Sequence, residues 1–288
     1  MKRFIKKIAC LIIITPFAFV IMNYIYFGTL NYLIHTYRIA GEVFYVIDKA
    51  EYNSGRETVY IGGSLCNQIW PQNHDSENIA HLGCNNGIMA AGNYLLLKKY
   101  LEHNQQTKEV YYLILPESLC YGDYSYPYFV IPFLDSDNIK LLEHETREVL
   151  YKKFGKFFVT NSHIKYFFLN NIELMKICLD FIKDKSDKIN TSHRLSKTSI
   201  TYLAKIRELC QEHNVKIFIL PLPMADTSKN YGWDEYEQDI IKYGFKDLFG
   251  NFVEKIHYYP ENWFSDGVHF KPQILDQHRE EIADAILR

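Results

Sequence analysis

The chain has 288 residues, enough for one large core or for one core with a smaller appendage. Its formal charge is −2 and it has no Lys/Arg-rich stripe, which argues against nucleic acid as the main partner. Aromatic residues make up 16% of the chain, a composition that suits a protein working beside a membrane or a carbohydrate.

The N-terminus has the pattern of a membrane anchor. Four basic residues lie within the first seven positions, and an uncharged run follows at residues 8–30. As a helix this run would span about 34 Å, enough for a hydrocarbon core of roughly 30 Å. A cleaved signal peptide is the alternative, but it would have a shorter apolar region ending in small residues. We therefore expect residues 1–30 to be a basic tip and an uncleaved single-pass anchor in the plasma (inner) membrane, with a cytoplasmic N-terminus and an extracytoplasmic main domain.

A helical connector is expected at 31–57, and strand and helix patterns alternate after it. The apolar runs predicted as buried strands are 58–63, 78–83, 109–116, 215–223 and, as a fifth, 252–259. The patterns predicted as helices are 88–104, 196–214 and 271–288. This order predicts an α/β domain over 58–288, with a parallel sheet between two layers of helices.

Residues from about 118 to 195 interrupt this alternation. They contain an aromatic loop at 121–133 and two helical patterns, near 138–153 and 161–184. We interpret the segment as an insertion at the carboxyl edge of the sheet, either a lid or a membrane-facing subdomain.

The cysteines that follow the predicted anchor are odd in number: Cys66, Cys84, Cys120, Cys178 and Cys210. An exported protein built on disulfides usually has an even set, so we expect mostly buried free thiols. The pair to examine for a disulfide is the first two. No CxxC or Cys/His spacing indicates a metal site, and no cofactor is required.

Ser64 directly follows the first predicted strand, in the stretch "IGGSLC". Ligands of open parallel sheets bind beyond the carboxyl ends of the strands. Gly62 and Gly63 would let the backbone turn sharply and let another group come close. Ser64 is then either a nucleophile or the cap of the next helix, and this stretch alone favours the cap.

Asp266 and His269 stand three residues apart in "FSDGVHF", just before the last predicted helix. A serine hydroxyl needs a neutral imidazole to accept its proton, and the imidazole needs a carboxylate to fix its tautomer. A single D-x-x-H turn can supply both groups. Such a turn alone is usually a local cap beside an exposed histidine, so the combination with Ser64 on an α/β frame is what favours catalysis.

These motifs resemble the conserved blocks of the SGNH/GDSL esterase superfamily. "IGGSLC" is similar to the first block, "LGCNNG" at 82–87 to the second and "DGVH" to the last. The resemblance spans 58–288 apart from the insertion. It implies a flavodoxin-like three-layer fold of the SGNH hydrolase type, with Ser64 as the nucleophile, His269 as the base and Asp266 as its orienting partner.

The resemblance also implies an oxyanion hole formed by Ser64, Gly87 and Asn86, with Gly83 as a less favoured donor. One departure from the family pattern is Gly63, which stands where the family usually has aspartate.

A second departure follows the third predicted strand, where the family normally offers an asparagine. Here the sequence is "LPESL", with Glu117 and Ser118 at that place. An ionised glutamate cannot donate a hydrogen bond to an oxyanion. Two alternatives stay open here: Ser118, Asn85 or Asn86 takes the place of the missing asparagine, or the oxyanion hole is incomplete. We assign Glu117 and Ser118 to substrate binding.

Together with the anchor, these departures resemble SGNH-like proteins that modify cell-envelope polymers, including alginate O-acetylation proteins and the D-alanyl transfer protein of teichoic acid synthesis. The resemblance implies a membrane-anchored serine esterase or O-acyltransferase acting on acyl esters of an envelope glycan or a lipid-linked carrier. It also implies a membrane-bound O-acyltransferase as a partner. Two alternatives stay open: a non-catalytic protein of this fold that binds glycan or docks on such an acyltransferase, and a lipase or esterase for small molecules.

Overall fold

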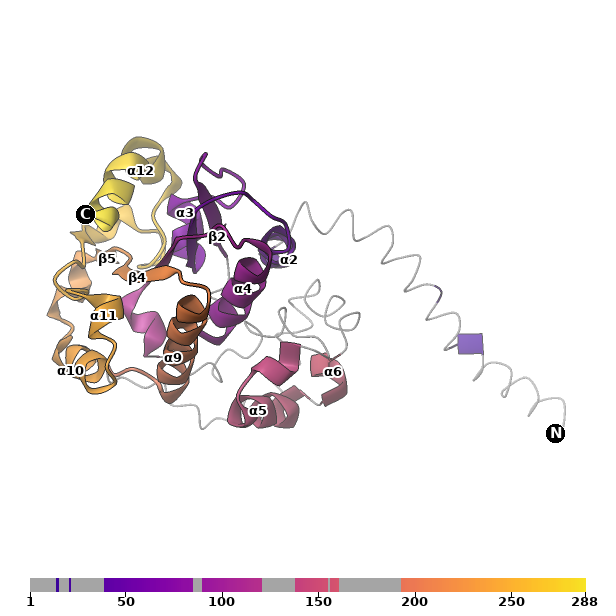
Figure 1. Cartoon of the computed structure of the whole chain (residues 1–288). Coiled ribbons are helices and arrows are strands. Elements are labelled where there is room, and N and C mark those ends of the chain that lie inside the picture. Colours follow the sequence, from indigo (N-terminus) through magenta and orange to yellow (C-terminus); the bar gives the residue numbers. More distant parts are fainter. Residues whose placement is uncertain are drawn as a thin grey trace, which may run out of the picture.

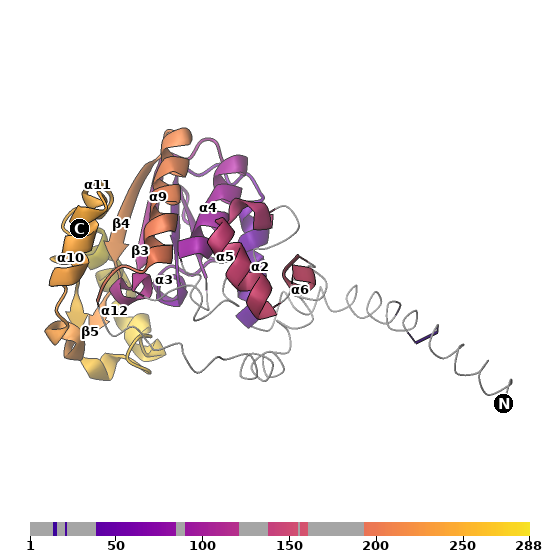
Figure 2. The same ribbon diagram turned by 90° about the horizontal axis from the view of Figure 1, so that it is seen from below.

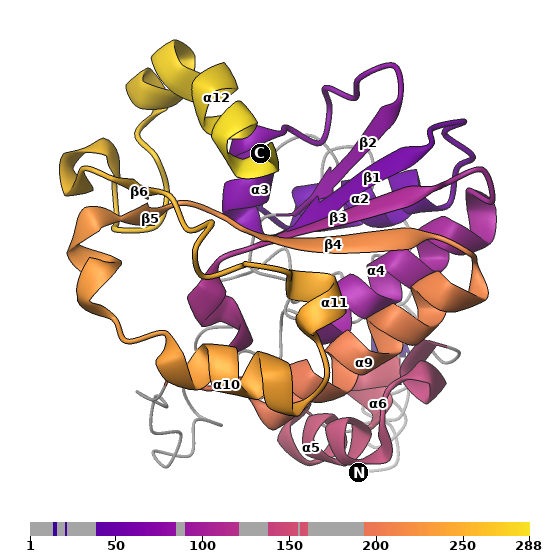
Figure 3. The same ribbon diagram turned by 60° about the vertical axis from the view of Figure 1, so that its left-hand side comes forward.

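A computed structural model describes residues 14–15, 21, 39–84, 90–120, 138–154, 156–160 and 193–288. Within this part of the chain a parallel sheet lies at the centre of an α/β fold (Figure 3). Its strands are β1 (Thr58–Gly62), β2 (Ile79–Gly83), β3 (Glu109–Ile114) and β4 (Lys216–Pro221). They are ordered β2-β1-β3-β4, and every neighbouring pair is parallel. This order matches the first strands of a flavodoxin-like sheet, as expected.

The four predicted strands are confirmed, each slightly shorter than its apolar run. β3 ends at Ile114 and Pro116 follows it, since proline cannot donate a ladder hydrogen bond. Each strand is more exposed at its amino end and fully buried at its carboxyl end. The carboxyl edge is therefore where the chain leaves a well-packed core.

Two hydrophobic cores lie on the two faces of the sheet. Side chains such as Val59 and Ile61 of β1 point into the larger core, which α2, α4 and α9 cover. Those of Tyr60 and Leu113 point into the smaller core, which α3 and α12 cover. Figure 3 shows α3 and α12 on one side of the sheet and α4 and α9 on the other. The bounds of these helices are Ile39–Ala50 (α2), Ser64–Ile69 (α3), Ala90–His103 (α4), Lys197–Glu212 (α9) and Pro272–Leu287 (α12).

The predicted helices of the core are confirmed where the structure describes them. α9 begins after Ser196, whose hydroxyl accepts a hydrogen bond from the Ser199 backbone N–H at 3.1 Å. α12 has Pro272 in its first turn, where a missing N–H costs nothing. α4 and α9 pack side by side, as Figure 2 shows.

The predicted fifth strand is wrong over most of its length. Only β6 (Tyr258–Tyr259) is extended, and it pairs with β5 (Met224–Ala225) in a separate two-stranded sheet. Residues 252–255 form turns instead, and Phe252 and Ile256 both face the larger core, four residues apart. This is a helical spacing, which the apolar content alone did not distinguish from a strand.

Short helices follow β4. They are η5 (Asp226–Asn230), α10 (Asp234–Lys242), α11 (Lys246–Phe249) and η6 (Glu261–Trp263). Buried side chains of α10 and α11, such as Ile240 and Phe249, belong to the larger core. α11 contacts β4, and η6 leads into the segment that contains Asp266 and His269.

The predicted insertion is helical in the parts that the structure describes: η4 (Asn138–Leu141), α5 (His144–Phe154) and α6 (Lys156–Thr160). A buried hydrogen bond of 3.1 Å from the Tyr202 hydroxyl to Thr146 Oγ1 fixes α5 against α9. The aromatic loop at 121–133 and the helical pattern at 161–184 lie outside the described residues.

Within the described part of the chain, no helix has both the length and the apolar composition needed to cross a bilayer. Apart from residues 14, 15 and 21, the run at 8–30 lies outside that part. The described portion of the predicted connector contains α2 (Figure 1). Lys49 near the end of α2 donates hydrogen bonds to the carbonyl oxygens of Gln72 and His81.

The helix α3 lies directly against the ends of β1 and β2, and two glycines make this possible. A Cβ on Gly62 would lie 2.2 Å from the Leu113 carbonyl oxygen and 2.8 Å from Cys66 Cβ. A Cβ on Gly83 would lie 2.7 Å from the Asn67 backbone nitrogen. All three separations are below 3.0 Å, which real Cβ atoms essentially never show, so neither position tolerates a side chain unless α3 or a strand moves.

The cysteines that the structure describes are not joined by disulfides, as expected. Cys66, Cys84, Cys120 and Cys210 are all buried and none forms a disulfide, including the pair singled out from the sequence. Burial raises the pKa of the Cys120 and Cys210 thiols to about 12 and that of Cys66 further. These thiols are packing groups of low reactivity.

We predict that Gly62→Ala lowers the free energy of unfolding by about 1–3 kcal/mol, because the added methyl group overpacks the junction of β1, β3 and α3. Gly232→Ala is the matched control, since nothing lies within 4 Å of its Cβ position, and it should change stability by less than about 1 kcal/mol. Urea unfolding of the full chain measures both. Equal effects of the two substitutions would contradict the close-packing argument.

Candidate active site

Ser64 is the first residue of α3, at the carboxyl end of β1. The N-cap of this helix is Gly63, with φ −87° and no side-chain cap hydrogen bond. Ser64 is therefore not the helix cap that its sequence context favoured. Gly63 is in the extended region that any residue adopts, so the glycine pair permits close approach at Gly62 rather than an unusual turn.

The segment that carries Asp266 and His269 is a closed loop. Phe264 and Phe270 form an isolated antiparallel bridge at its base, and their rings stack with centroids 4.5 Å apart. Within the loop, the Ser265 backbone N–H donates to the His269 carbonyl at 2.8 Å. Gly267 has φ +82°, which favours glycine at the tip. The loop thus has a defined shape although most of its residues are exposed.

The Asp266 carboxylate organises the tip of this loop. Its Oδ1 accepts hydrogen bonds from the backbone N–H groups of Val268, at 3.1 Å, and His269, at 2.8 Å. Its Oδ2 lies 2.7 Å from His269 Nδ1. The D-x-x-H spacing therefore places one oxygen on the backbone and leaves the other for the imidazole.

The loop and α3 meet at the serine. His269 Nε2 lies 2.7 Å from Ser64 Oγ, across 205 positions in the sequence. Because Nδ1 faces a carboxylate, the neutral ring carries its proton on Nδ1, and this N–H donates a hydrogen bond to Asp266. Nε2 is then the acceptor, and the Ser64 hydroxyl donates to it. The three residues that the sequence singled out are brought into one hydrogen-bonded chain.

The hydrogen bonds that Asp266 accepts favour its ionised form. Burial alone would raise the pKa of this carboxyl, but the hydrogen bonds from the backbone and ring of His269 and from the Val268 backbone hold it below the usual value. The His269 side chain is 32% exposed and that of Asp266 56% exposed, so solvent or a substrate reaches the chain from outside.

A second contact joins α3 to the loop one residue further along. The Gln68 side chain donates from Nε2 to the Phe270 carbonyl at 3.3 Å and accepts from the Phe270 backbone N–H at its Oε1 at 3.1 Å. Arg279 of α12 donates to the carbonyls of Gln68 and Ile69. The motif comparison missed both residues. The available signal was the four-residue spacing from Ser64, which places Gln68 on the same face of a helix.

Glu117 and Ser118 lie after β3, in η1 (Pro116–Leu119). The Ser118 hydroxyl donates to the carbonyl of Leu115 at 2.7 Å, so it is used within its own turn. Glu117 is half-buried, and burial raises the pKa of its carboxyl while nearby His193 partly opposes the shift. No hydrogen bond connects either residue to the Ser64 chain within the described part of the protein.

The remaining predicted oxyanion donors, Gly87 and Asn86, lie outside the described residues. Gly83 is at the end of β2, where its lack of a side chain makes room for the α3 backbone. Among the residues that the structure describes, no group of three His, Cys, Asp or Glu side chains could hold a metal ion.

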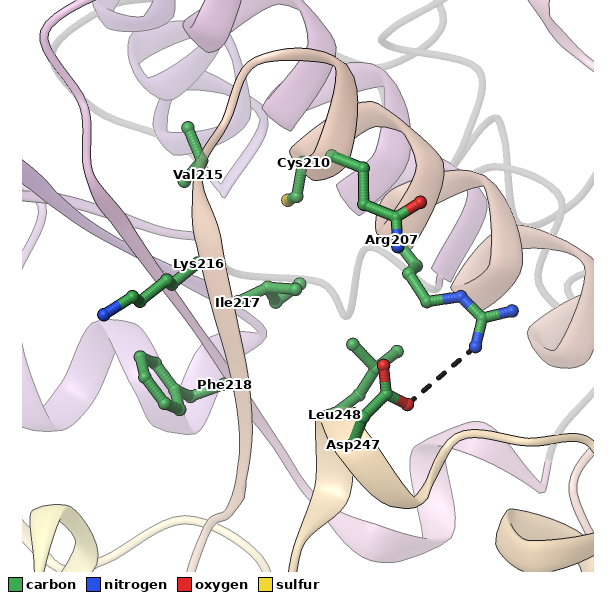
Figure 4. A pocket seen from close by; sticks show the side chains of 9 residues that line it. Arg207, Cys210, Val215, Lys216, Ile217, Phe218, Asp247 and Leu248 are labelled. Carbon is green, nitrogen blue, oxygen red and sulfur yellow. Dashed lines mark ion pairs between the residues drawn. The ribbon is translucent and has the colours of Figure 1, made fainter.

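A pocket of about 280 Å³ lies at the opposite edge of the sheet (Figure 4). It is formed by the end of α9, the first residues of β4 and α11, and Arg207 reaches across it to Asp247 at 3.8 Å. Ser64 follows the carboxyl end of its strand, whereas this pocket adjoins the amino end of β4. The pocket is therefore separate from the serine site.

Comparisons with known proteins add little to this geometry. No protein-family model matches the chain, and no curated protein matches its sequence. One solved structure, from Streptococcus pneumonia and described as a candidate platelet activating factor, is similar over 92% of this chain and 97% of its own. The identity is 10% and the TM-score 0.38. Any function has to be argued from the site itself.

We predict that His269→Ala raises the pKa of Asp266 toward its usual value, because it removes the ring hydrogen bond and leaves the two backbone ones. A lowered carboxyl pKa stabilises the folded protein above the usual value, and this contribution is lost as the pH falls through the folded pKa. The variant should therefore lose less stability on acidification than the wild type.

Carboxyl ¹³C NMR titration of Asp266 measures this shift. Ser64→Ala is the control, because it leaves both partners of the carboxylate in place and should leave the titration unchanged. An Asp266 titration that is identical in the wild type and His269→Ala would show that the ring does not contact the carboxylate.

Proposed function

We propose that this protein is a serine esterase or O-acyltransferase in which Ser64 is the nucleophile, His269 the general base and Asp266 its orienting partner. The observation that supports the proposal is the hydrogen-bonded chain from Ser64 Oγ through His269 to Asp266, with 2.7 Å at each link. This arrangement has the geometry of a nucleophile–base–carboxylate triad. Its position beyond the carboxyl end of β1 is where parallel sheets bind ligands.

In the first half of the reaction, Ser64 Oγ attacks the carbonyl carbon of an ester and its proton passes to His269 Nε2. Asp266 stabilises the imidazolium that forms and holds Nδ1–H in place. When the tetrahedral intermediate collapses, the carbon–oxygen bond to the alcohol breaks and His269 gives its proton to the leaving oxygen. The acyl group is then an ester of Ser64.

In the second half, an acceptor hydroxyl attacks the acyl-enzyme and His269 accepts its proton. Collapse returns the proton to Ser64 Oγ and releases the acyl group on its new oxygen. Water as acceptor gives hydrolysis, and a sugar hydroxyl gives transfer. We favour transfer to an envelope glycan, because the sequence resembles anchored polymer-modifying proteins.

The negative charge that develops on the carbonyl oxygen needs hydrogen-bond donors. We propose the backbone N–H of Ser64 and groups of Gly87 and Asn86 for this role. We further propose that Glu117 and Ser118 contact the substrate rather than the oxyanion, since an ionised carboxylate has no proton to donate.

We predict that a fluorophosphonate probe labels the full chain once, at Ser64, because the probe reacts with serines that an imidazole activates. Ser64→Ala should abolish labelling, and His269→Ala should slow it by about 10³-fold or more. Ser76→Ala, which alters an exposed serine at the opposite edge of the sheet, should label at the wild-type rate. Mass spectrometry of the labelled peptides locates the adduct.

Labelling that survives in Ser64→Ala, or a wild type that is not labelled at all, would contradict the esterase proposal. The second result would favour the non-catalytic alternative, in which the same fold binds a glycan or docks on a membrane-bound O-acyltransferase.

We also propose that residues 8–30 anchor the chain in the plasma membrane, with the Ser64 site on the extracytoplasmic side. The four basic residues before this run and their absence directly after it support this orientation. A membrane-bound O-acyltransferase that delivers the acyl group across the membrane is the partner that fits this arrangement.

We predict that the full chain sediments with membranes and resists extraction by alkaline carbonate, because a helix of this length buries its apolar side chains in the bilayer. Deletion of residues 1–30 should release the protein to the supernatant. A full chain that carbonate extracts as readily as the deletion variant would contradict the anchor.

A further inference from the structure

α3 and the 264–270 loop contact each other at two points, and neighbouring residues of the loop meet residues one helical turn apart on α3. On the helix, the contact residues are Ser64 and Gln68, four apart and hence on one face. On the loop they are His269 and Phe270, which are consecutive. Ser64 hydrogen-bonds the His269 ring, and Gln68 hydrogen-bonds both backbone groups of Phe270. The second point fixes how the helix face is rotated relative to the loop.

A primary amide suits this second point for a chemical reason. The Phe270 backbone has one donor, its N–H, and one acceptor, its carbonyl. The Gln68 side chain accepts from the N–H with its oxygen and donates to the carbonyl with its NH₂ group. A glutamate of the same length would keep the acceptor but would place a second acceptor against the Phe270 carbonyl. An alanine would leave both backbone groups without this partner.

The helix needs external support because it is short. α3 has six residues and no side-chain cap at Gly63, so its own hydrogen bonds hold it weakly. Its C-terminal carbonyls would lack intrahelical donors. Arg279 donates to two of them, those of Gln68 and Ile69, from α12. Gln68 is thus held at its backbone by α12 and at its side chain by the loop.

The loop end of the contact is rigid where Gln68 reaches it. Phe270 is 1% exposed, and its ring packs on Phe264 and, edge to face at 5.7 Å, on Tyr259. The neighbouring His269 side chain is 32% exposed; among the described residues its ring has no aromatic partner like those of Phe270, and the Asp266 carboxylate binds its Nδ1. Asp266 orients the ring within the loop, and the position of the loop relative to Ser64 depends on how the Phe270 backbone is fixed to α3.

We propose that Gln68 is a positioning residue of the Ser64 site, which sets the alignment of His269 Nε2 with Ser64 Oγ through the Phe270 backbone. This inference rests on the proposed esterase function and names a residue outside the motifs that suggested it. Gln68 does not touch the reacting atoms. Its loss should slow the attack of Ser64 while leaving substrate binding intact.

The test compares Gln68→Ala with Gln72→Ala in the full chain. Gln72 is a matched control: it is also a glutamine, it lies four residues further along, it is 8% exposed, and its side-chain oxygen has no hydrogen-bond partner in the described structure. The first readout is the rate constant and final stoichiometry of fluorophosphonate labelling. The second is the division of any loss between kcat and KM for p-nitrophenyl acetate.

We expect Gln68→Ala to lower the labelling rate constant and kcat by about 10- to 100-fold, because a misplacement near 1 Å can cost that much. The final stoichiometry and KM should stay at wild-type values. The labelling rate constant and kcat of Gln68→Glu should fall between those of the wild type and Gln68→Ala, since one of the two hydrogen bonds to Phe270 remains. Gln72→Ala should match the wild type in both rate and stoichiometry.

Three results would overturn the proposal: a Gln68→Ala rate within twofold of the wild type, an equal loss in Gln72→Ala, or a loss of stoichiometry at an unchanged rate. The last would mean that Gln68 only supports folding. If the wild type itself does not react, the esterase function fails, but the alignment is still measurable. The ¹⁵N shift of His269 Nε2 should then differ between Gln68→Ala and the wild type, and an unchanged shift would overturn the positioning role.

Discussion

The serine site depends on how closely α3 approaches the ends of β1 and β2. A side chain on Gly62 would collide with the Leu113 carbonyl of β3 and the Cys66 side chain, and one on Gly83 would collide with the α3 backbone at Asn67. Because both positions are glycine, α3 can begin at Ser64 directly beyond the end of β1. The buried faces of Leu65, Cys66 and Ile69 then hold the helix against the smaller core. α3 is short and has no side-chain cap, so the packing of its buried side chains against the smaller core fixes its position.

The second half of the site comes from the other end of the described chain. The Phe264–Phe270 bridge closes the loop, the Asp266 carboxylate shapes its tip, and α12 follows immediately. Since α12 packs on α3, the helix that completes the fold also brings the loop to the serine. Packing of the smaller core therefore also assembles the hydrogen-bonded chain, in which Ser64 Oγ and His269 Nε2, 205 positions apart, lie 2.7 Å from each other.

Much of this was predictable from the sequence, for physical reasons. Buried strands bounded by glycine and proline gave four correct strands, and D-x-x-H before the last helix gave the Asp266–His269 pair. The 252–259 run was not predictable, since Phe252 and Ile256 are apolar in either a strand or a turn and only the packed core decides between them. The role of Ser64 was ambiguous for a similar reason: cap and nucleophile have the same local sequence, and only contact with a distant histidine separates them. Gln68 was not predicted because its partner is a backbone, which leaves no side-chain signature; only its four-residue spacing from Ser64 pointed to it.

The central claim is that the Ser64 hydroxyl becomes acylated. The most direct measurement is an acid quench of the full chain during turnover of p-nitrophenyl acetate, followed by peptide mapping. We expect one acetyl group on the peptide that contains Ser64, accumulating before steady state and disappearing when the ester is exhausted. Ester consumption with no acetyl group on Ser64, or with the group on another residue, would contradict the claim.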